Sequence, residues 1–98
     1  MGDLKIALGR ILLGKEGAVE ELVMFRYCYI PSETLRFVYI AIRAISRKCF
    51  HVTKDSVLAY LRRETFATPQ DLIAYSNMID SVIQEAALSE LHDKGEVL

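Results

Sequence analysis

The stretch from residue 35 to residue 45, LRFVYIAIRAI, is almost entirely apolar and has helical periodicity. As a helix it leaves little more than one thin stripe for water, made of Arg36, Arg43 and Arg47. A helix that is apolar on most of its circumference has to be covered by other elements on most of its sides. This stretch therefore restricts the chain to folds in which further segments pack around a central helix.

The rest of the chain also reads as helical, because strict alternation of apolar and polar residues is missing and apolar residues recur at helical spacing. We therefore predict an all-α fold, a compact orthogonal bundle of about five helices. At 98 residues the chain is expected to form one domain, with a helical head at 1–64 and a longer amphipathic helix at 69–93. The expected helices cover residues 3–13, 18–25, 33–48, 54–64 and 69–93.

Three polar residues mark expected helix starts. Ser32 and Thr53 each precede a helical stretch and can accept a hydrogen bond from its first turn. At Thr68-Pro69-Gln70-Asp71, a threonine cap is followed by proline at the first helical position and by an acid three residues after the cap. This last pattern predicts a capping box at the start of the final helix.

Apolar residues of the final helix alternate spacings of three and four, a heptad-like seam of about two repeats. The seam is too short to indicate a coiled coil, which needs three or four heptads. We expect the helix to pair with one neighbour, either within the chain or across a dimer. Plain core packing explains the seam equally well. The candidate self-association residues are Leu72, Tyr75, Ile79, Val82, Ile83 and Ala86.

Charge is distributed unevenly although the net charge is only −1. Residues 26–63 carry eight Lys or Arg against two acids, a balance of +6, whereas residues 65–98 carry six acids against one Lys, a balance of −5. The two regions can be complementary within the fold or between two copies, or the basic region can meet an acidic partner or a phosphate backbone. The candidate partner-binding residues are Arg36, Arg43, Arg47, Arg62 and Arg63.

One segment has the spacing of a phosphate-binding loop, GxxxxGK, from Gly9 to Lys15. The next residue is Glu16, which cannot supply the hydroxyl that holds magnesium and would repel a triphosphate. The residues between the glycines are mostly Ile and Leu, and no apolar strand precedes them. We therefore expect Gly9 to permit close helix packing and Gly14 to end the first helix.

No catalytic, metal or cofactor site is predicted. Cys28 and Cys49 are far apart without a CxxC pattern, and a nucleophilic pair of Cys49 with His51 has no defined turn to support it. His92 lies among the acids of a polar helix end. The chain begins without the basic and apolar regions of a secretory signal, and no segment is long and apolar enough for a membrane span. These features favour a cytoplasmic protein without membrane contact.

The order and content of these helices resemble the N-terminal domain of the DnaB-type replicative DNA helicases. That family opens with a helix of the kind EAEQALLGAIL, to which residues 3–12, DLKIALGRIL, are similar. The IFxAI core of its third helix looks like residues 38–42, VYIAI. Its PID–TV–L element is similar to residues 51–61, and its AYAxIVxE helix to residues 74–79, AYSNMI. The likeness extends over nearly the whole chain.

The chain also departs from the family pattern. The GGxxYLxxL helix that usually precedes the AY helix is missing, and only residues 65–68 join its two neighbours. Leu35 stands where the family often has His, and Thr53 replaces an Asp. These departures suggest a phage, plasmid or otherwise outlying member.

The resemblance implies a protein-interaction and oligomerisation domain with no chemistry and no cofactor of its own. Such domains form the N-terminal collar of the helicase, associate as dimers or higher oligomers through a helical hairpin, and dock primase or the helicase loader in DNA replication. The final helix would be the first arm of that hairpin. ATP hydrolysis would belong to a following motor domain, so DNA would be contacted only indirectly.

Two other classes remain open. One is a stand-alone phage-type regulator, or a small primase-like module, that binds helicase or primase. The other is a small helical DNA-binding protein that uses residues 56–63 as a recognition helix, which would bind duplex DNA in a salt-dependent way.

Overall fold

A computed structural model describes residues 2–25, 29–48 and 51–95, and within these residues the chain is a compact all-α fold without strands. Five α-helices and one short 3-10 helix, η1, follow one another, and the C-terminal helix is the longest. The prediction of an all-α bundle of about five helices is confirmed. The elements are α1 (Gly2–Leu12), α2 (Ala18–Glu21), η1 (Leu22–Phe25), α3 (Glu33–Ser46), α4 (Lys54–Glu64) and α5 (Pro69–Gly95).

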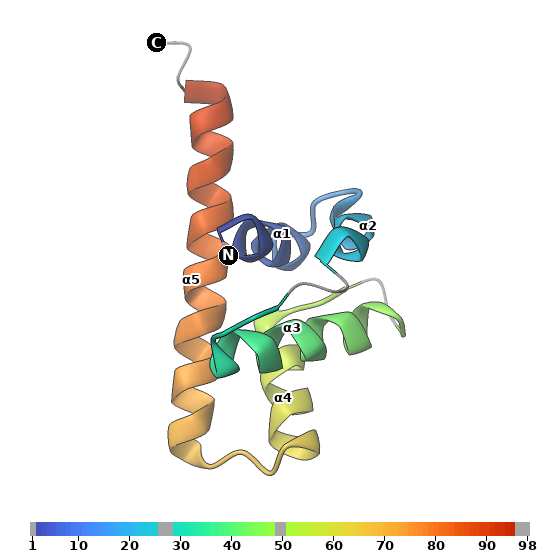
Figure 1. Cartoon of the computed structure of the whole chain (residues 1–98), viewed down its shortest axis with the longest axis vertical. Helices are drawn as coiled ribbons and strands as arrows, with labels where there is room; N and C mark the ends of the chain where they lie inside the picture. The colour runs from blue at the N-terminus through green and yellow to red at the C-terminus, as the bar shows by residue number, and fades with distance from the viewer. Residues whose placement is uncertain (1, 26–28, 49–50, 96–98) are drawn as a thin grey trace.

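Helix α5 forms a column along the long axis of the molecule, and all other helices lie on one side of it (Figure 1). Its 27 residues span about 40 Å at 1.5 Å per residue, most of the 47 Å length of the molecule. Helix α1 crosses the middle of α5, whereas α3 and α4 pack against the half that begins at Pro69. The other end of α5 extends beyond α1, as Figure 1 shows.

The predicted caps are present at three helix starts. The Ser32 hydroxyl accepts a hydrogen bond from the backbone N–H of Leu35 at 3.2 Å, and Thr53 forms a capping box at the start of α4. At the start of α5 the Asp71 backbone N–H donates to the Thr68 hydroxyl at 3.1 Å, and the Asp71 carboxylate accepts from the Thr68 N–H at 3.0 Å. These reciprocal bonds satisfy donors that the helix itself cannot.

The core collects the apolar faces of all the helices around α3 and α5. On α3 buried and partly buried residues take up most of the circumference, as its near-continuous apolar sequence requires. On α5 the first half contributes to the same core as α1 and α4, so α5 is part of the head rather than a separate arm. The largest fully buried side chains are Leu4, Leu8, Val38, Ile42, Val57, Leu61, Ile79 and Val82.

Helices α1 and α5 approach most closely at Gly9. A Cβ atom at this position would overlap the backbone carbonyl oxygen of Val82 and would lie 2.7 Å from the Cβ of Ala86. Only the missing side chain of glycine lets the two backbones meet at this distance. The expectation that Gly9 permits close helix packing is confirmed.

We expect Gly9→Ala to lower the free energy of unfolding by about 2 kcal/mol or more, because the added methyl group has to push two helix backbones apart. Helix propensity alone would give the opposite sign, a gain of about 1 kcal/mol. Urea denaturation followed by circular dichroism measures the difference. The control is Asn77→Ala, an exposed position in α5 where the alanine meets no neighbour. A neutral or stabilising Gly9→Ala would contradict the close crossing.

Candidate interaction surface

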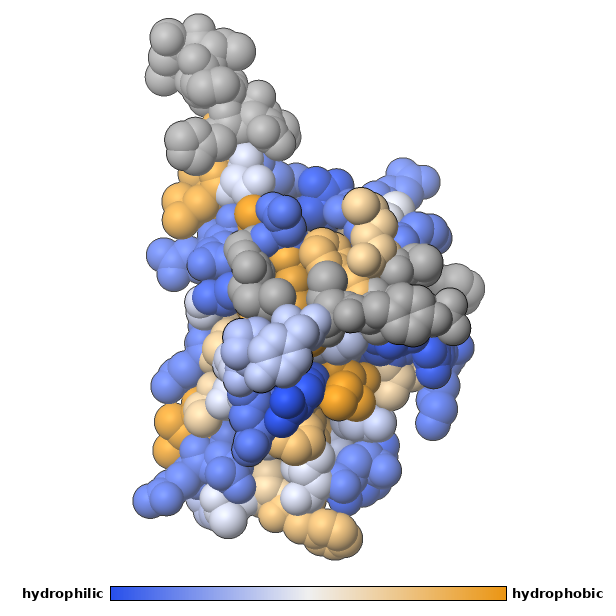
Figure 2. All heavy atoms as spheres, in the orientation of Figure 1, coloured by the Kyte–Doolittle hydropathy of each residue, from blue (hydrophilic) through white to orange (hydrophobic). Residues whose placement is uncertain are grey.

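The exposed side of α3 carries a row of four residues, Arg36, Ile40, Arg43 and Arg47. Their spacing of four, three and four residues places them along one face of the helix. The arginines were predicted to face water, but Ile40 was not, and it is 46% exposed in the middle of the row. The stripe is therefore mixed, with an apolar side chain between cations. Figure 2 shows such apolar and strongly hydrophilic residues side by side over α3.

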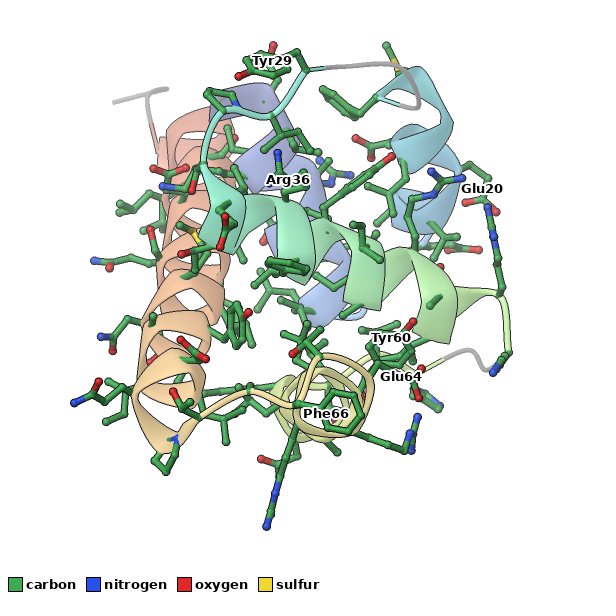
Figure 3. The ribbon with its side chains drawn as sticks, turned by 60° about the horizontal axis from the view of Figure 1, so that its bottom comes forward. Glu20, Tyr29, Arg36, Tyr60, Glu64 and Phe66 are labelled. Atoms are coloured by element: carbon green, nitrogen blue, oxygen red, sulfur yellow. The ribbon has the colours of Figure 1, made fainter. Side chains whose placement is uncertain are left out.

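Two shallow hollows lie on either side of Ile40, which lines both of them. The first, of about 270 Å³, is also lined by Tyr29, Ile30, Arg36 and Tyr39. The second, of about 260 Å³, is also lined by Arg43, Ala44, Arg47 and Tyr60. In Figure 3, Tyr29 lies beside Arg36 on one side of α3 and Tyr60 on the other. We call this row with its two hollows the α3 face.

Tyr39 holds Arg43 in position on the α3 face. The Tyr39 hydroxyl donates a hydrogen bond to the backbone carbonyl of Phe25 at 3.4 Å and accepts one from Nη1 of Arg43 at 3.3 Å. The guanidinium carbon of Arg43 lies 5.6 Å from the centroid of the Tyr39 ring, within the range of a cation–π contact. Because Tyr39 itself is buried, the arginine is anchored to the core while its charge faces outward.

On α4, Tyr60 and Arg63 border the α3 face. The guanidinium carbon of Arg63 lies 5.8 Å from the Tyr60 ring centroid, and its Nε pairs with Glu64 at 3.0 Å. Arg62 is also exposed but lines neither hollow. Of the five predicted partner-binding residues, the structure thus brings Arg36, Arg43 and Arg47 together, places Arg63 at the edge and leaves Arg62 outside.

Among the described residues, acids of α5 pair with lysines and not with the arginines of the α3 face. Three acids of α5 pair with lysines: Glu85 with Lys5 at 3.3 Å, Glu90 with Lys15 at 3.1 Å and Asp80 with Lys54 at 2.8 Å. These lysines belong to α1, to the segment that follows it and to α4. No acid of α5 pairs with a described arginine of the α3 face, where the carboxylate of Glu33 reaches Arg36 only at 4.0 Å.

The heptad-like seam of α5 lies inside the core of a single chain. Tyr75, Ile79, Val82 and Ala86 are buried, and Leu72 and Ile83 pack against them partly exposed. In this conformation the four buried side chains are not accessible to a second copy. The apolar residues that α5 does expose lie elsewhere on it: Ile73, Leu88 and Leu91.

Because the seam is core, we expect Ile79→Glu combined with Val82→Glu to unfold the chain rather than only to dissociate an oligomer. Both side chains are fully buried, and an unpaired buried carboxylate costs several kcal/mol. Two of them exceed the stability of a small domain, about 5–10 kcal/mol. Circular dichroism should show loss of helix at room temperature. A variant that stays helical would show that these residues are not part of the core.

The segment with phosphate-loop spacing is helix and turn. Gly9 is buried within α1, and Gly14 adopts a left-handed φ of 75° just after the helix ends. Lys15, which would have to reach phosphates, pairs with Glu90 of α5. The expectation that Gly14 ends the first helix is confirmed.

A third, smaller hollow of about 60 Å³ lies where α3 and α5 begin, lined by Glu33, Asp71 and Tyr75 together with three neighbours. The Tyr75 ring meets Phe37 edge-on, with centroids 6.2 Å apart. Burial raises the pKa of the Tyr75 hydroxyl above its usual value of 10.0; a hydrogen bond with Thr65 partly offsets this, and the two carboxylates add to it. The tyrosine therefore stays neutral and packs the helix starts together.

The remaining predictions concern the cysteines, the histidines, metal binding and membrane spans. Cys28 and Cys49 lie outside the described residues, so the pair of Cys49 with His51, which the sequence did not support, is not described either. Among residues 2–25, 29–48 and 51–95, no group of His, Cys, Asp and Glu is arranged to hold a metal ion. In the same part of the chain, no helix combines the length and the apolar character that crossing a bilayer requires.

Comparisons with known protein families, with curated proteins and with solved structures find no match to this chain. The likeness to the replicative helicase domain therefore stays a prediction from the sequence motifs. The α3 face was only partly predicted: its arginines were, but Ile40, Tyr29 and Tyr60 were not. The spacing of Ile40, four residues after Arg36 and three before Arg43, was the signal that could have identified it.

Proposed function

We propose that this chain is a non-catalytic docking domain of the replicative helicase type, which holds primase or the helicase loader during DNA replication. In this proposal it forms the N-terminal collar, and ATP-driven strand separation belongs to a motor domain that follows it. DNA is contacted only through that motor. The domain works in the cytoplasm, where replication takes place, and needs no cofactor of its own.

The observation that carries the proposal is the α3 face. An isoleucine that is 46% exposed stands between arginines, and each of the two hollows beside it is bordered by tyrosine. Interfaces between proteins are enriched in Tyr and Arg around an apolar centre. The anchoring of Arg43 by Tyr39 further reduces the entropy that a partner would have to remove on binding.

We expect Arg47→Glu to weaken binding of the chain to primase or to the loader encoded in the same genome by about tenfold, or about 1.4 kcal/mol. The lost arginine is exposed on the α3 face, and the new carboxylate repels an acidic partner. Isothermal titration calorimetry with the purified partners measures the change.

The matched control is Arg62→Glu, which makes the same charge change at the C-terminal end of α4 but lies outside the α3 face. It should leave binding within about twofold, since exposed charges outside an interface contribute little. Equal weakening by both variants would mean that general charge, not the α3 face, attracts the partner. Absence of binding to both partners would reject the proposed role.

Self-association, the second part of the proposed role, has to use surface that the core leaves open. Leu88 and Leu91 are 51% and 64% exposed, and they lie three residues apart on the end of α5 that extends beyond α1. They are thus well placed to meet a second copy or the second arm of a helical hairpin. This position replaces the buried seam as the proposed contact.

We expect Leu88→Glu combined with Leu91→Glu to shift the chain from oligomer to monomer without loss of helix. A charged residue at an exposed position changes the free energy of unfolding by about 0.5 kcal/mol or less. A carboxylate placed in an apolar contact between two copies is unpaired and destabilises that contact. Analytical ultracentrifugation over a range of concentrations gives the oligomeric state, and circular dichroism checks the fold. An unchanged sedimentation coefficient in a chain that does associate would rule out this end of α5.

A regulator that captures helicase or primase would use the same face, and the sequence encoded after Leu98 separates the two: a motor domain there indicates the helicase. Direct DNA binding through α4 is less favoured, because Glu64 pairs with Arg63 and Asp55 lies exposed in its first turn. Duplex binding that falls steeply with salt would indicate it.

A further inference from the structure

The length and the residue spacing of the α3 face match those of a second helix lying alongside it. Arg36, Ile40, Arg43 and Arg47 stand at positions i, i+4, i+7 and i+11, so the row is about 16 Å long at 1.5 Å per residue. A second helix of about three turns presents side chains at the same repeat. An extended peptide advances about 3.3 Å per residue, with alternate side chains pointing to the other side, so it does not match the row.

Ile40 forms a ridge between the two hollows, because it lines both. A helix lying along the row can place one apolar side chain in each hollow, on either side of that ridge. The floor for such side chains is apolar: Ile30 contributes to the first hollow and Ala44 to the second, and a tyrosine borders each. Arginines stand at the ends of both hollows, where acidic residues of the incoming helix would lie.

Two of the three tyrosines, together with two carboxylates, argue against nucleic acid as the occupant. Single-stranded DNA and RNA bind to such surfaces by stacking bases on open aromatic faces. On the α3 face Tyr29 is 78% exposed, but the Tyr39 ring is buried and carries the guanidinium of Arg43, and the Tyr60 ring carries that of Arg63, so there is no series of open rings for successive bases. The carboxylates of Glu33 and Glu64, which pair with arginines at the two margins of the face, would repel a phosphate backbone.

From this geometry we infer that the α3 face binds an acidic amphipathic helix, which inserts apolar side chains into the two hollows beside Ile40 and sets its carboxylates against Arg36, Arg43 and Arg47. The inference rests on the proposed docking function and names the part of a partner that would be recognised. Helix-in-groove binding of this kind takes its affinity from the apolar anchors and its orientation from the charges.

The test uses a synthetic peptide of about four helical turns, with leucines along one face and glutamates beside them. Titration into the ¹⁵N-labelled chain should shift the amide signals of α3 around Ile40 and those of Tyr29 and Tyr60. A scrambled peptide of the same composition, with the same charge but no apolar face, should bind at least about tenfold more weakly. Binding that is equal for both peptides would overturn the inference.

Two variants of the chain distinguish a specific contact at Ile40 from non-specific binding to exposed apolar residues. Ile40→Ser should weaken peptide binding about tenfold, whereas Ile73→Ser, at an isoleucine of α5 that is even more exposed (61% against 46%), should leave it within about twofold. Equal loss in both would overturn the inference. So would the finding that single-stranded or duplex DNA, and not the peptide, shifts the α3 signals.

The outcomes distinguish this inference from the proposed function. If primase or loader binds the chain and the peptide neither binds nor competes, the helical occupant is wrong and the docking role stands. If the peptide binds with the expected dependence on Ile40 but neither replication protein does, the acidic helix is supported and the identity of the partner is wrong.

Discussion

The closeness of α1 to α5 at Gly9 determines how the rest of the molecule is arranged. At the crossing, the backbone of Gly9 lies against the carbonyl of Val82 and the Cβ of Ala86. Larger side chains of both helices, such as Leu8 and Ile79, are fully buried. Lys5 and Lys15 then lie near enough to α5 to pair with Glu85 and Glu90. The crossing therefore fixes both the apolar contact and the charge pairing of these two helices.

The charge pairing of α5, in the part of the chain that the structure describes, does not involve the arginines of the α3 face. Acids of α5 are matched by lysines of α1, of the segment after it and of α4. Lysine suits such exposed bridges, because its compact charge on a flexible stem tolerates imperfect geometry. On α3, Arg43 instead lies against Tyr39, where a planar guanidinium can stack. These acids of α5 are thus paired with lysines, whereas Arg43 on the α3 face is held by a tyrosine.

Three helix starts could be predicted from the sequence because they depend on local chemistry, whereas the single helix expected over 18–25 is a short α-helix followed by a 3-10 helix. Ser32, Thr53 and Thr68 are good caps wherever they stand before an apolar helix, and each caps the helix expected of it. The turn between α4 and α5 shows the limit. Phe66 takes the left-handed φ of 52° that glycine usually supplies after a helix, and it is 89% exposed. The neighbouring sequence offers no glycine, so only the fold reveals which residue takes that conformation.

The candidate site was less predictable, because periodicity says which residues share a face but not what covers that face. The arginine row of α3 was expected to face water, whereas for the seam of α5 the sequence left core packing and self-association equally open, and four of its six residues are buried in the core. Ile40 shows why: its hydropathy predicts burial, but no other described helix covers it fully and it is 46% exposed.

The same reasoning explains why the two functions proposed for this chain can be separated. Helix α5 is longer than the body it packs against, so its first two thirds, up to Ala86, are held by the core, and its last turns, with Leu88 and Leu91, are not. The α3 face lies on the head, away from those turns. A change at one of these surfaces leaves the core contacts of the other intact. Docking and self-association are thus expected to respond to mutation independently, because the free-energy changes of mutations at distant sites without shared partners are additive.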